Sequence, residues 1–432
     1  MADYGIRIIR IVEIMGVYYT FILSERPRRQ THGDAQEKLS QQGLLSSSAQ
    51  ALLFVTVIYA AVIALLSVPF IQRHVAYEHW ITEPWHRTFD VPEKYGLAPG
   101  KTLDLKVHTS DNVTLGAWFM LADPYYQILR VSSPEPLSQP SIATIEDAIK
   151  SRPTILYFHG SAGSRCTTWR IQHYLAWTAR LNANIFAIDY RGFGNSEGSP
   201  FEDGIKLDSY AAWDWLMDHG AKPEDVLVLG HSLGTGVTGK LASRLAREGV
   251  KPRGVVLLAP FSSLSILLET YEIWGFPLLQ PLQSFALGRK IVKRLASELY
   301  DTLSVIHEFN VPTLIAHSTD DMDIPHSHAR TLVDKLLDPL LPADFPLPDM
   351  PGAPVSHEHF QAFMEAQQKR KEARTALVRK VDVPALGTIE QFDGTFGTVV
   401  YVETKWGAHS KVGLQEGVQD IIASTFKLGV HA

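Results

Sequence analysis

Short, continuously apolar runs recur along the chain and predict buried β-strands. They cover residues 154–158, 184–189, 225–229, 255–259, 313–316 and 398–402. The intervals between the first four runs show helical spacing of apolar residues, as in 169–181 and 206–219. Strands that are apolar on both faces and alternate with helices are typical of a mostly parallel sheet covered by helices on both sides. We therefore expect an α/β domain over residues 101–432, with active groups at the carboxyl ends of its strands.

Three further segments surround this alternation. Residues 102–108 and 113–120 alternate in polarity and predict a hairpin at the start of the sheet. The aromatic and leucine-rich stretch within residues 262–305 follows a strand end, and we interpret it as a cap over the active groups. Residues 338–395 begin with six prolines and continue with a charged helical piece over 367–379. Such an insertion is expected to be exposed and mobile.

The N-terminal part has the pattern of a membrane anchor. Residues 51–71 are uncharged, and their number matches the roughly 20 residues that a helix needs to cross a bilayer. Pro69 lies near the end of this run. A buried helix of a soluble domain is the alternative, but this run is apolar on every face. Within the tail 1–50, residues 8–23 predict an interfacial helix, and residues 25–48 are polar and expected to be loosely ordered. Residues 72–100 form a juxtamembrane linker.

Charge around this helix favours one orientation. The basic residues Arg26, Arg28, Arg29 and Lys38 precede it, whereas only Arg73 and Arg87 closely follow it. Because positive charge is enriched on the cytosolic side, we expect a cytosolic N-terminus and a domain that faces the lumen or the outside. There Asn112-Val113-Thr114 would be a candidate glycan acceptor.

Composition excludes several classes of function. The chain has 432 residues, 45% hydrophobic and 20% charged, and a net charge of -6, which argues against a nucleic-acid partner. The single cysteine, Cys166, excludes an intramolecular disulfide, and no motif around it indicates a catalytic thiol. The pairs His326-x-His328 and His357-Glu358-His359 lack a third ligand at a recognisable spacing. We therefore expect neither a metal nor a cofactor.

The strongest chemical signal is Gly230-His231-Ser232-Leu233-Gly234, where an apolar run ends and a helical pattern begins. This is the Gly-x-Ser-x-Gly nucleophile elbow, whose tight turn needs the two glycines and exposes the serine above the sheet. An ordinary glycine-rich turn is the alternative. A serine hydroxyl is a weak nucleophile, so a catalytic reading also requires a histidine and a carboxylate.

The other parts of such a site follow strand ends. His159-Gly160-Ser161-Ala162-Gly163 comes directly after residues 154–158, where elbow enzymes place half of the oxyanion hole. We expect the backbone N–H groups of Ser161 and Leu233 to hold the oxyanion, although the glycines alone would also suit a tight loop. The order Ser, Asp, His points to His409 as the base, because it follows the last strand. The loop after residues 313–316 offers Asp320, Asp321 and Asp323 as carboxylates.

These motifs resemble the membrane-anchored α/β-hydrolase domain-containing protein 12 group. The matching pieces are residues 159–165, 189–198 and 230–236 and the Asp320-Asp321 loop, within a resemblance that spans 102–337 and continues from 409. It includes the upstream transmembrane helix and implies an α/β-hydrolase fold. The family pattern Asp-x-x-hydrophobic-Pro selects Asp321, four residues before Pro325, with Asp320 as the fallback. The insertion after Leu337 is longer than in the group.

The resemblance implies hydrolysis of ester bonds in monoacyl lipids, such as monoacylglycerol or lysophosphatidylserine, at an endoplasmic-reticulum membrane. The partners would then be a lipid substrate and the bilayer, which suits an anchored domain with an apolar cap. Two alternatives stay open. The run Asp-Tyr-Arg-Gly-Phe-Gly-x-Ser at 189–196 is shared with protein depalmitoylases, which would act on a thioester. The chain could also be a tethered binding protein with an unused hydrolase fold that docks partners through its proline-rich insertion.

Overall fold

The computed structural model describes residues 34–81, 88–132, 138–270, 300–346 and 356–429, together with a few residues between 271 and 299. The chain divides into two units, Met1–Leu65 and Leu66–Ala432. The predicted interfacial helix over residues 8–23 lies outside the described residues.

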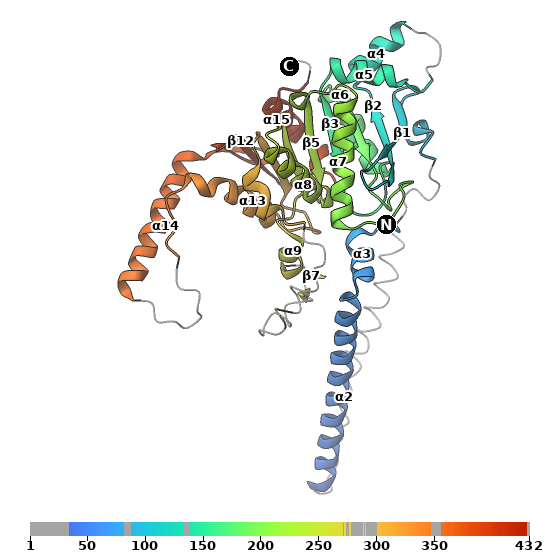
Figure 1. Ribbon diagram of the computed structural model, residues 1–432. Coiled ribbons are helices and arrows are strands. Elements are labelled where there is room, and N and C mark those ends of the chain that lie inside the picture. Colours follow the sequence, from blue (N-terminus) through green and yellow to red (C-terminus); the bar gives the residue numbers. More distant parts are fainter. Residues whose placement is uncertain are drawn as a thin grey trace. The chain divides into compact units, whose positions relative to one another are not determined.

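The described part of the first unit belongs to one long helix, α2 (Asp34–Leu66) (Figure 1). Its stretch Ala49–Leu66 is the one described helix segment long and apolar enough to cross a membrane. Residues 25–48 were predicted to be loosely ordered. That prediction is wrong for residues 34–48, because the helix begins at Asp34. An acidic residue suits a helix start, and Ala, Gln, Glu, Lys and Leu are good helix formers.

The helix also ends earlier than expected, at Leu66 instead of residue 71. A second helix, α3 (Pro69–Tyr77), starts with the proline in its first turn. Proline has no N–H and clashes with the preceding turn in a helix interior, but it fits the first helical position. Pro69 therefore separates the apolar span from a short helix that belongs to the second unit.

The second unit contains a ten-stranded sheet in the order β1-β2-β4-β3-β5-β6-β9-β12-β11-β10. Its strands are β1 (Thr102–His108), β2 (Thr114–Met120), β3 (Thr154–Phe158), β4 (Asn184–Ile188), β5 (Val226–His231), β6 (Gly254–Leu258), β9 (Thr313–Ser318), β10 (Arg379–Val383), β11 (Gly387–Gly394) and β12 (Gly397–Thr404). The six strands from β4 to β12 are parallel, and the two outer pairs are antiparallel. The predicted hairpin and mostly parallel α/β sheet are thus confirmed.

Helices pack on both faces of this sheet. On one face α7 (Glu202–Asp218) and α8 (Leu233–Arg247) share a core with Val226 and Val228 of β5. On the other face α6 (Thr168–Arg180) and α15 (Glu416–Phe426) pack against Leu227 and Leu229 of the same strand. Alternate side chains of β5 therefore enter opposite cores, which explains why the strand is apolar throughout.

The remaining helices lie around the sheet. They are α4 (Asp123–Ser132), α5 (Ile142–Ser151), α9 (Leu264–Thr270), α12 (Thr302–Val305), α13 (Ser327–Leu337) and α14 (His357–Leu377), with 3₁₀ turns at Pro92–Tyr95, Pro223–Asp225, Ile306–Glu308, Asp338–Leu340 and Val412–Leu414. Within the second unit, α4 and α5 lie at the opposite end from α3 (Figure 1). In the predicted cap, α9 is followed by a small pair of strands, β7 (Glu272–Ile273) and β8 (Phe276–Pro277). Most of the cap after residue 270 lies outside the described residues.

The insertion is more regular than its sequence indicated. Helix α14 projects from the body of the second unit with none of its residues buried (Figure 1). The chain then returns as β10 and β11, which extend the sheet beyond β12, so residues 379–394 are not a mobile excursion. Arg330 of α13 binds Glu390 of β11 at 2.8 Å, and Arg374 of α14 lies 3.4 Å from the same carboxylate. The Arg330–Glu390 pair joins the insertion to the rest of the domain, whereas the Arg374–Glu390 pair joins two parts of the insertion.

Candidate active site

The nucleophile elbow forms where β5 passes into α8. Ser232 has φ 54° and ψ -122°, a conformation that costs free energy in any residue with a side chain. A Cβ atom on Gly230 would lie 2.2 Å from the carbonyl oxygen of Gly234, and one on Gly234 would lie 2.0 Å from that of Phe158. The two glycines are therefore required by close backbone approach on both sides of the serine.

Three predicted side chains meet at the carboxyl edge of the parallel strands. Ser232 follows β5, Asp321 lies in the loop after β9, and His409 lies in the loop after β12. The Ser232 hydroxyl is 2.8 Å from His409 Nε2, and His409 Nδ1 is 2.8 Å from Asp321 Oδ2. A neutral imidazole satisfies both bonds by accepting from the serine and donating to the carboxylate.

Asp321 is the aspartate that contacts the imidazole. Its neighbour Asp320 accepts a hydrogen bond from the backbone N–H of Ala408 at 2.7 Å, and Asp323 is exposed. Asp321 Oδ1 accepts the backbone N–H groups of Asp323 and Ile324, both at 2.9 Å. These two bonds fix the orientation of the Asp321 carboxylate independently of His409.

A second histidine shares this carboxylate. His317 is fully buried, and its Nε2 lies 3.0 Å from Asp321 Oδ2. Burial by itself would raise the pKa of Asp321, but hydrogen bonds from His317 and His409 hold it well below its usual range. Asp321 is thereby kept ionised, which is the state that stabilises a charged imidazole. No role was predicted for His317, because a histidine within an apolar strand has no distinctive sequence pattern.

The loop that carries His409 is held from two sides. His231 is buried, and burial lowers its pKa, so it stays neutral and donates from Nε2 to the His409 carbonyl at 2.8 Å. On the other side, the N–H of Ala408 donates to Asp320 as described, and Ala408 itself has φ 44°. The His231 and Asp320 contacts therefore offset the strain in this loop and orient the imidazole.

The predicted oxyanion loop lies against the serine. A Cβ atom on Gly160 would be only 3.0 Å from Ser232 Cβ. The backbone N–H of Leu233, the first residue of α8, has no acceptor within its own helix. His159 is fully buried and its Nδ1 lies 2.7 Å from the Gly160 carbonyl oxygen. Gly160 therefore lies against Ser232, and Leu233 directly follows it in the chain. That the N–H groups of Ser161 and Leu233 hold the oxyanion stays a prediction.

A buried arginine organises the loop. The guanidinium of Arg170 on α6 donates to the carbonyl oxygens of Gly160, Ser161, Ala162 and Ser164 at 2.8 to 3.0 Å. These four carbonyls are thereby turned toward α6. Sequence reasoning missed Arg170, because an arginine inside a helical pattern is normally a surface residue.

The long motif at residues 189–198 supports the same loop. Tyr190 donates its hydroxyl to the His159 carbonyl at 2.8 Å. Asp189 is fully buried and binds both the backbone and the guanidinium of Arg165. Burial would raise the pKa of Asp189, but the charge of Arg165 lowers it to about 2. Tyr190 and Asp189 therefore hold the chain on both sides of the predicted oxyanion loop, at His159 and at Arg165.

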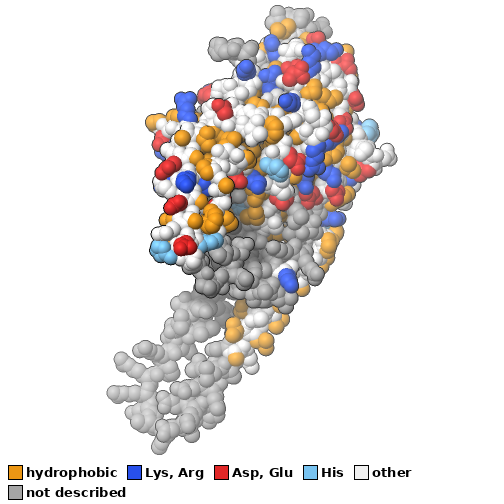
Figure 2. Space-filling model, turned by 60° about the vertical axis from the view of Figure 1, so that its left-hand side comes forward, with side chains coloured by type: hydrophobic (Ala, Val, Ile, Leu, Met, Phe, Trp, Pro, Cys, Tyr) orange, Lys and Arg blue, Asp and Glu red, His pale blue; other side chains and the backbone are white. Residues whose placement is uncertain are grey.

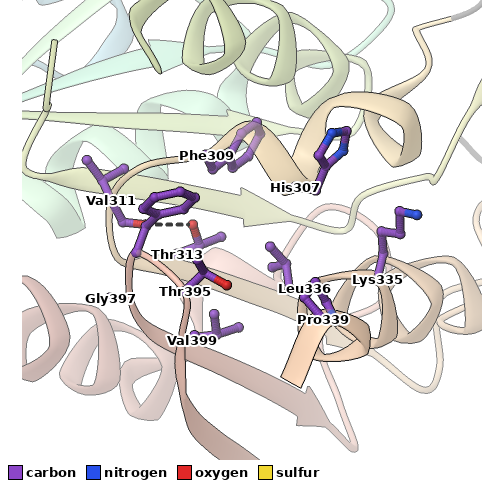
Figure 3. Close-up of a pocket in the computed structure, with 12 residues that line it drawn as sticks. His307, Phe309, Val311, Thr313, Lys335, Leu336, Pro339, Thr395, Gly397 and Val399 are labelled. Atoms are coloured by element: carbon purple, nitrogen blue, oxygen red, sulfur yellow. Dashed lines mark hydrogen bonds between the residues drawn. The ribbon is translucent and has the colours of Figure 1, made fainter. Parts of the chain in front are cut away.

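A cluster of possible metal ligands and a small pocket are two further features of the domain. Asp321, Asp323 and His409 have ligand atoms within 4.8 Å of one another, but the atoms of Asp321 and His409 already form hydrogen bonds, so a cation would have to displace them. A pocket of about 30 Å³ lies at the amino ends of β9 and β12, near Thr313 and Val399 (Figure 3). It has room for about one water and is at the opposite sheet edge from Ser232.

Charge on the visible surface of the second unit is mixed. Figure 2 shows acidic and basic side chains interspersed on the face that is drawn, among the residues that the structure describes.

The Alpha/beta hydrolase family matches residues 155–391, more than half of the chain, and the chain belongs to this family. Two relatives are named lysophosphatidylserine lipase ABHD12. The Danio rerio protein is 27% identical over 298 residues, which cover 68% of this chain and 73% of the relative. The Xenopus tropicalis protein is 28% identical over 302 residues, which cover 67% of this chain and 72% of the relative. The resemblance to this group is thereby confirmed. A solved alpha-beta hydrolase from Vibrio vulnificus is 15% identical, with a TM-score of 0.44, covering 76% of this chain and 81% of its own.

Proposed function

We propose that this protein is a membrane-anchored serine hydrolase that cleaves acyl esters of monoacyl lipids, either monoacylglycerol or a lysophospholipid. The proposal rests on the continuous hydrogen-bond series from Ser232 through His409 to Asp321. The names of the two relatives favour a lysophospholipid, and the apolar stretch of α2 favours an anchor. A substrate held in a bilayer suits both observations.

The reaction begins with attack on the ester. His409 Nε2 takes the hydroxyl proton of Ser232 as the serine oxygen bonds to the acyl carbonyl carbon. The carbonyl oxygen becomes an oxyanion held by the N–H groups of Ser161 and Leu233, and losing one such donor typically costs about 3 to 4 kcal/mol. Asp321 stabilises the positive charge that His409 acquires.

The second half returns the enzyme to its starting state. His409 gives its proton to the departing alcohol, which is glycerol or the head-group glycerol of a lysophospholipid, and the acyl group stays on Ser232. Water then attacks the acyl-enzyme while His409 again removes a proton. The fatty acid leaves, and the serine hydroxyl is restored.

Substrate choice is tested on the purified full-length protein. We expect release of fatty acid from monoacylglycerol or lysophosphatidylserine in mixed micelles, at a rate at least about a hundredfold above that for an S-palmitoylated peptide, because the proposed site takes an oxygen ester. Mass spectrometry of the released acid measures all three reactions with the same readout.

The alternative outcomes assign different functions. Hydrolysis of the peptide alone would make the protein a depalmitoylase. If folded protein neither cleaves any of the three substrates nor reacts with a fluorophosphonate probe, the site is silent, and a tethered binding role replaces the enzyme proposal.

We further propose that the hydrolase domain faces the lumen of the endoplasmic reticulum. The support is the excess of basic residues before the apolar stretch of α2, together with an exposed Asn112 at the turn between β1 and β2. Endoglycosidase H is expected to increase the gel mobility of the wild-type protein from cells and to leave Asn112→Gln unchanged. An unaltered wild-type mobility would contradict the lumenal placement, and Asn182→Gln serves as a control outside any glycan acceptor motif.

A further inference from the structure

The segment that directly follows the apolar helix supports the predicted oxyanion loop. The hydroxyl of Ser161 donates to the Ala76 carbonyl at 2.8 Å. The backbone N–H of Ala162 donates to the Tyr77 carbonyl at 2.9 Å, and that of Gly163 donates to the Ile81 carbonyl at 3.0 Å. Three successive loop residues therefore depend on α3 and the four residues after it.

The inner side of this segment is fixed to the hydrolase domain. Tyr77 is fully buried, and its hydroxyl lies 3.0 Å from that of Tyr300. Its ring also meets Phe193 edge to face, with centroids 6.4 Å apart. The guanidinium of Arg73 lies 5.5 Å from the ring centroid of Phe201. These contacts place α3 firmly within the second unit.

Three apolar side chains of the same segment are exposed. Phe70 is 66% exposed, Val75 58% and Trp80 60%, and we call these three side chains the outer apolar face. They are ordered by local contacts, because the Trp80 indole donates to the His74 carbonyl at 3.2 Å and the ring centroid of Phe70 lies 4.1 Å from that of His74. Single exposed apolar residues are common, but here three occur within eleven positions of one segment.

We propose that the outer apolar face lies in the interfacial layer of the bilayer that α2 enters, so that a monoacyl substrate reaches Ser232 directly from the membrane. Leu66 ends α2 and Pro69 begins α3, and three residue steps span at most about 11 Å. Helix α3 therefore cannot lie far from the end of the apolar span. Tryptophan is enriched at this depth of a membrane, where its ring is in an apolar layer and its N–H can still be satisfied.

The contact with the membrane would also position the catalytic groups. The backbone of residues 76–81 binds the oxyanion loop, while the side chains of the outer apolar face belong to the same short segment. Lipid contact and support of the predicted oxyanion loop thus come from one short segment. The choice of substrate in this inference rests on the proposed function, whereas the membrane contact itself does not.

The contact is tested on full-length protein in phosphatidylcholine vesicles. Phe70→Cys, Val75→Cys and Trp80→Cys are each labelled with an environment-sensitive fluorophore, and the native Cys166 gives little background because it is buried. Lipids spin-labelled near the head group are expected to quench these labels at least about threefold more than labels at Ile128→Cys and Phe396→Cys. The control positions are exposed and lie at the opposite sheet edge, on α4 and in the β11–β12 turn. Equal quenching at all five positions would overturn the proposal.

Substrate entry is tested by activity. Phe70→Ser/Val75→Ser is expected to hydrolyse monoacylglycerol embedded in vesicles about tenfold more slowly than wild type, and a water-soluble butyrate ester within about twofold of it. Ile128→Ser/Phe396→Ser should match wild type on both. An unchanged rate on the embedded lipid, or an equal loss on both substrates, would overturn entry from the membrane. If wild-type protein cleaves neither substrate, the proposed function fails, and the quenching result alone decides the membrane contact.

Discussion

Replacing Ser232 with alanine is expected to lower the rate of ester hydrolysis about a millionfold. The side chain loses only its oxygen, so the elbow keeps its shape, but no atom remains to attack the carbonyl or to carry the acyl group. The turnover number on monoacylglycerol, measured by mass spectrometry of released fatty acid, gives the effect. Labelling by a fluorophosphonate probe should be lost in the same variant.

A matched control separates chemistry from folding. Ser209 is a buried serine on α7 that donates to the Lys206 carbonyl at 2.7 Å. Ser209→Ala removes the same oxygen from a helix that contributes no residue to the Ser232–His409–Asp321 series, and it should leave turnover within about twofold of wild type. If Ser232→Ala retained more than about a hundredth of wild-type turnover, Ser232 would not be the nucleophile.

Replacing Asp321 with asparagine is expected to lower turnover about ten-thousandfold. The amide is nearly the same size as the carboxylate, but it carries no charge to stabilise a protonated His409. It can also present N–H toward Nδ1, which would select the wrong tautomer of the imidazole. Turnover with saturating monoacylglycerol measures this loss, and the Michaelis constant should change little, because Asp321 does not contact substrate in the proposed mechanism.

The neighbouring aspartates supply the comparison. Asp323 is exposed, so Asp323→Asn should stay within about threefold of wild type. Asp320→Asn weakens the bond to the Ala408 N–H and should cost about tenfold, because it acts on the loop that carries His409. If Asp320→Asn lowered turnover as much as Asp321→Asn does, the assignment of Asp321 as the carboxylate partner of His409 would be contradicted.

Features that depend on local sequence were predictable. The elbow was predicted from two glycines at fixed spacing after an apolar run. The structure explains both, because a Cβ atom added to Gly230 or Gly234 would lie 2.2 or 2.0 Å from a backbone carbonyl oxygen. The order of Ser232, Asp321 and His409 along the chain, each after a strand, was enough to bring them to one edge, because parallel strands share their carboxyl ends. The choice of Asp321 over Asp320 required the family pattern, since both follow β9 directly.

Features that depend on distant contacts were not predictable. Arg170 and His317 act through partners that other loops supply, and nothing in their immediate neighbours distinguishes them from a surface arginine and a core histidine. The part that residues 76–81 take in the site was also missed, because a juxtamembrane stretch is expected to be only a linker. Strand β10 was missed because three of its five residues, Arg379, Lys380 and Asp382, are charged.

Strand β10 affects what happens when two copies of this protein meet. Among the described residues β10 is the outermost strand at one edge of the sheet, so one of its sides presents backbone N–H and C=O groups that pair with no other described strand. An open edge of this kind can pair with the sheet of a second molecule. Arg379, Lys380 and Asp382 are exposed on this strand, and charged side chains at an edge oppose such fusion. The extra strands thus lengthen the domain without making it prone to aggregate with its own copies.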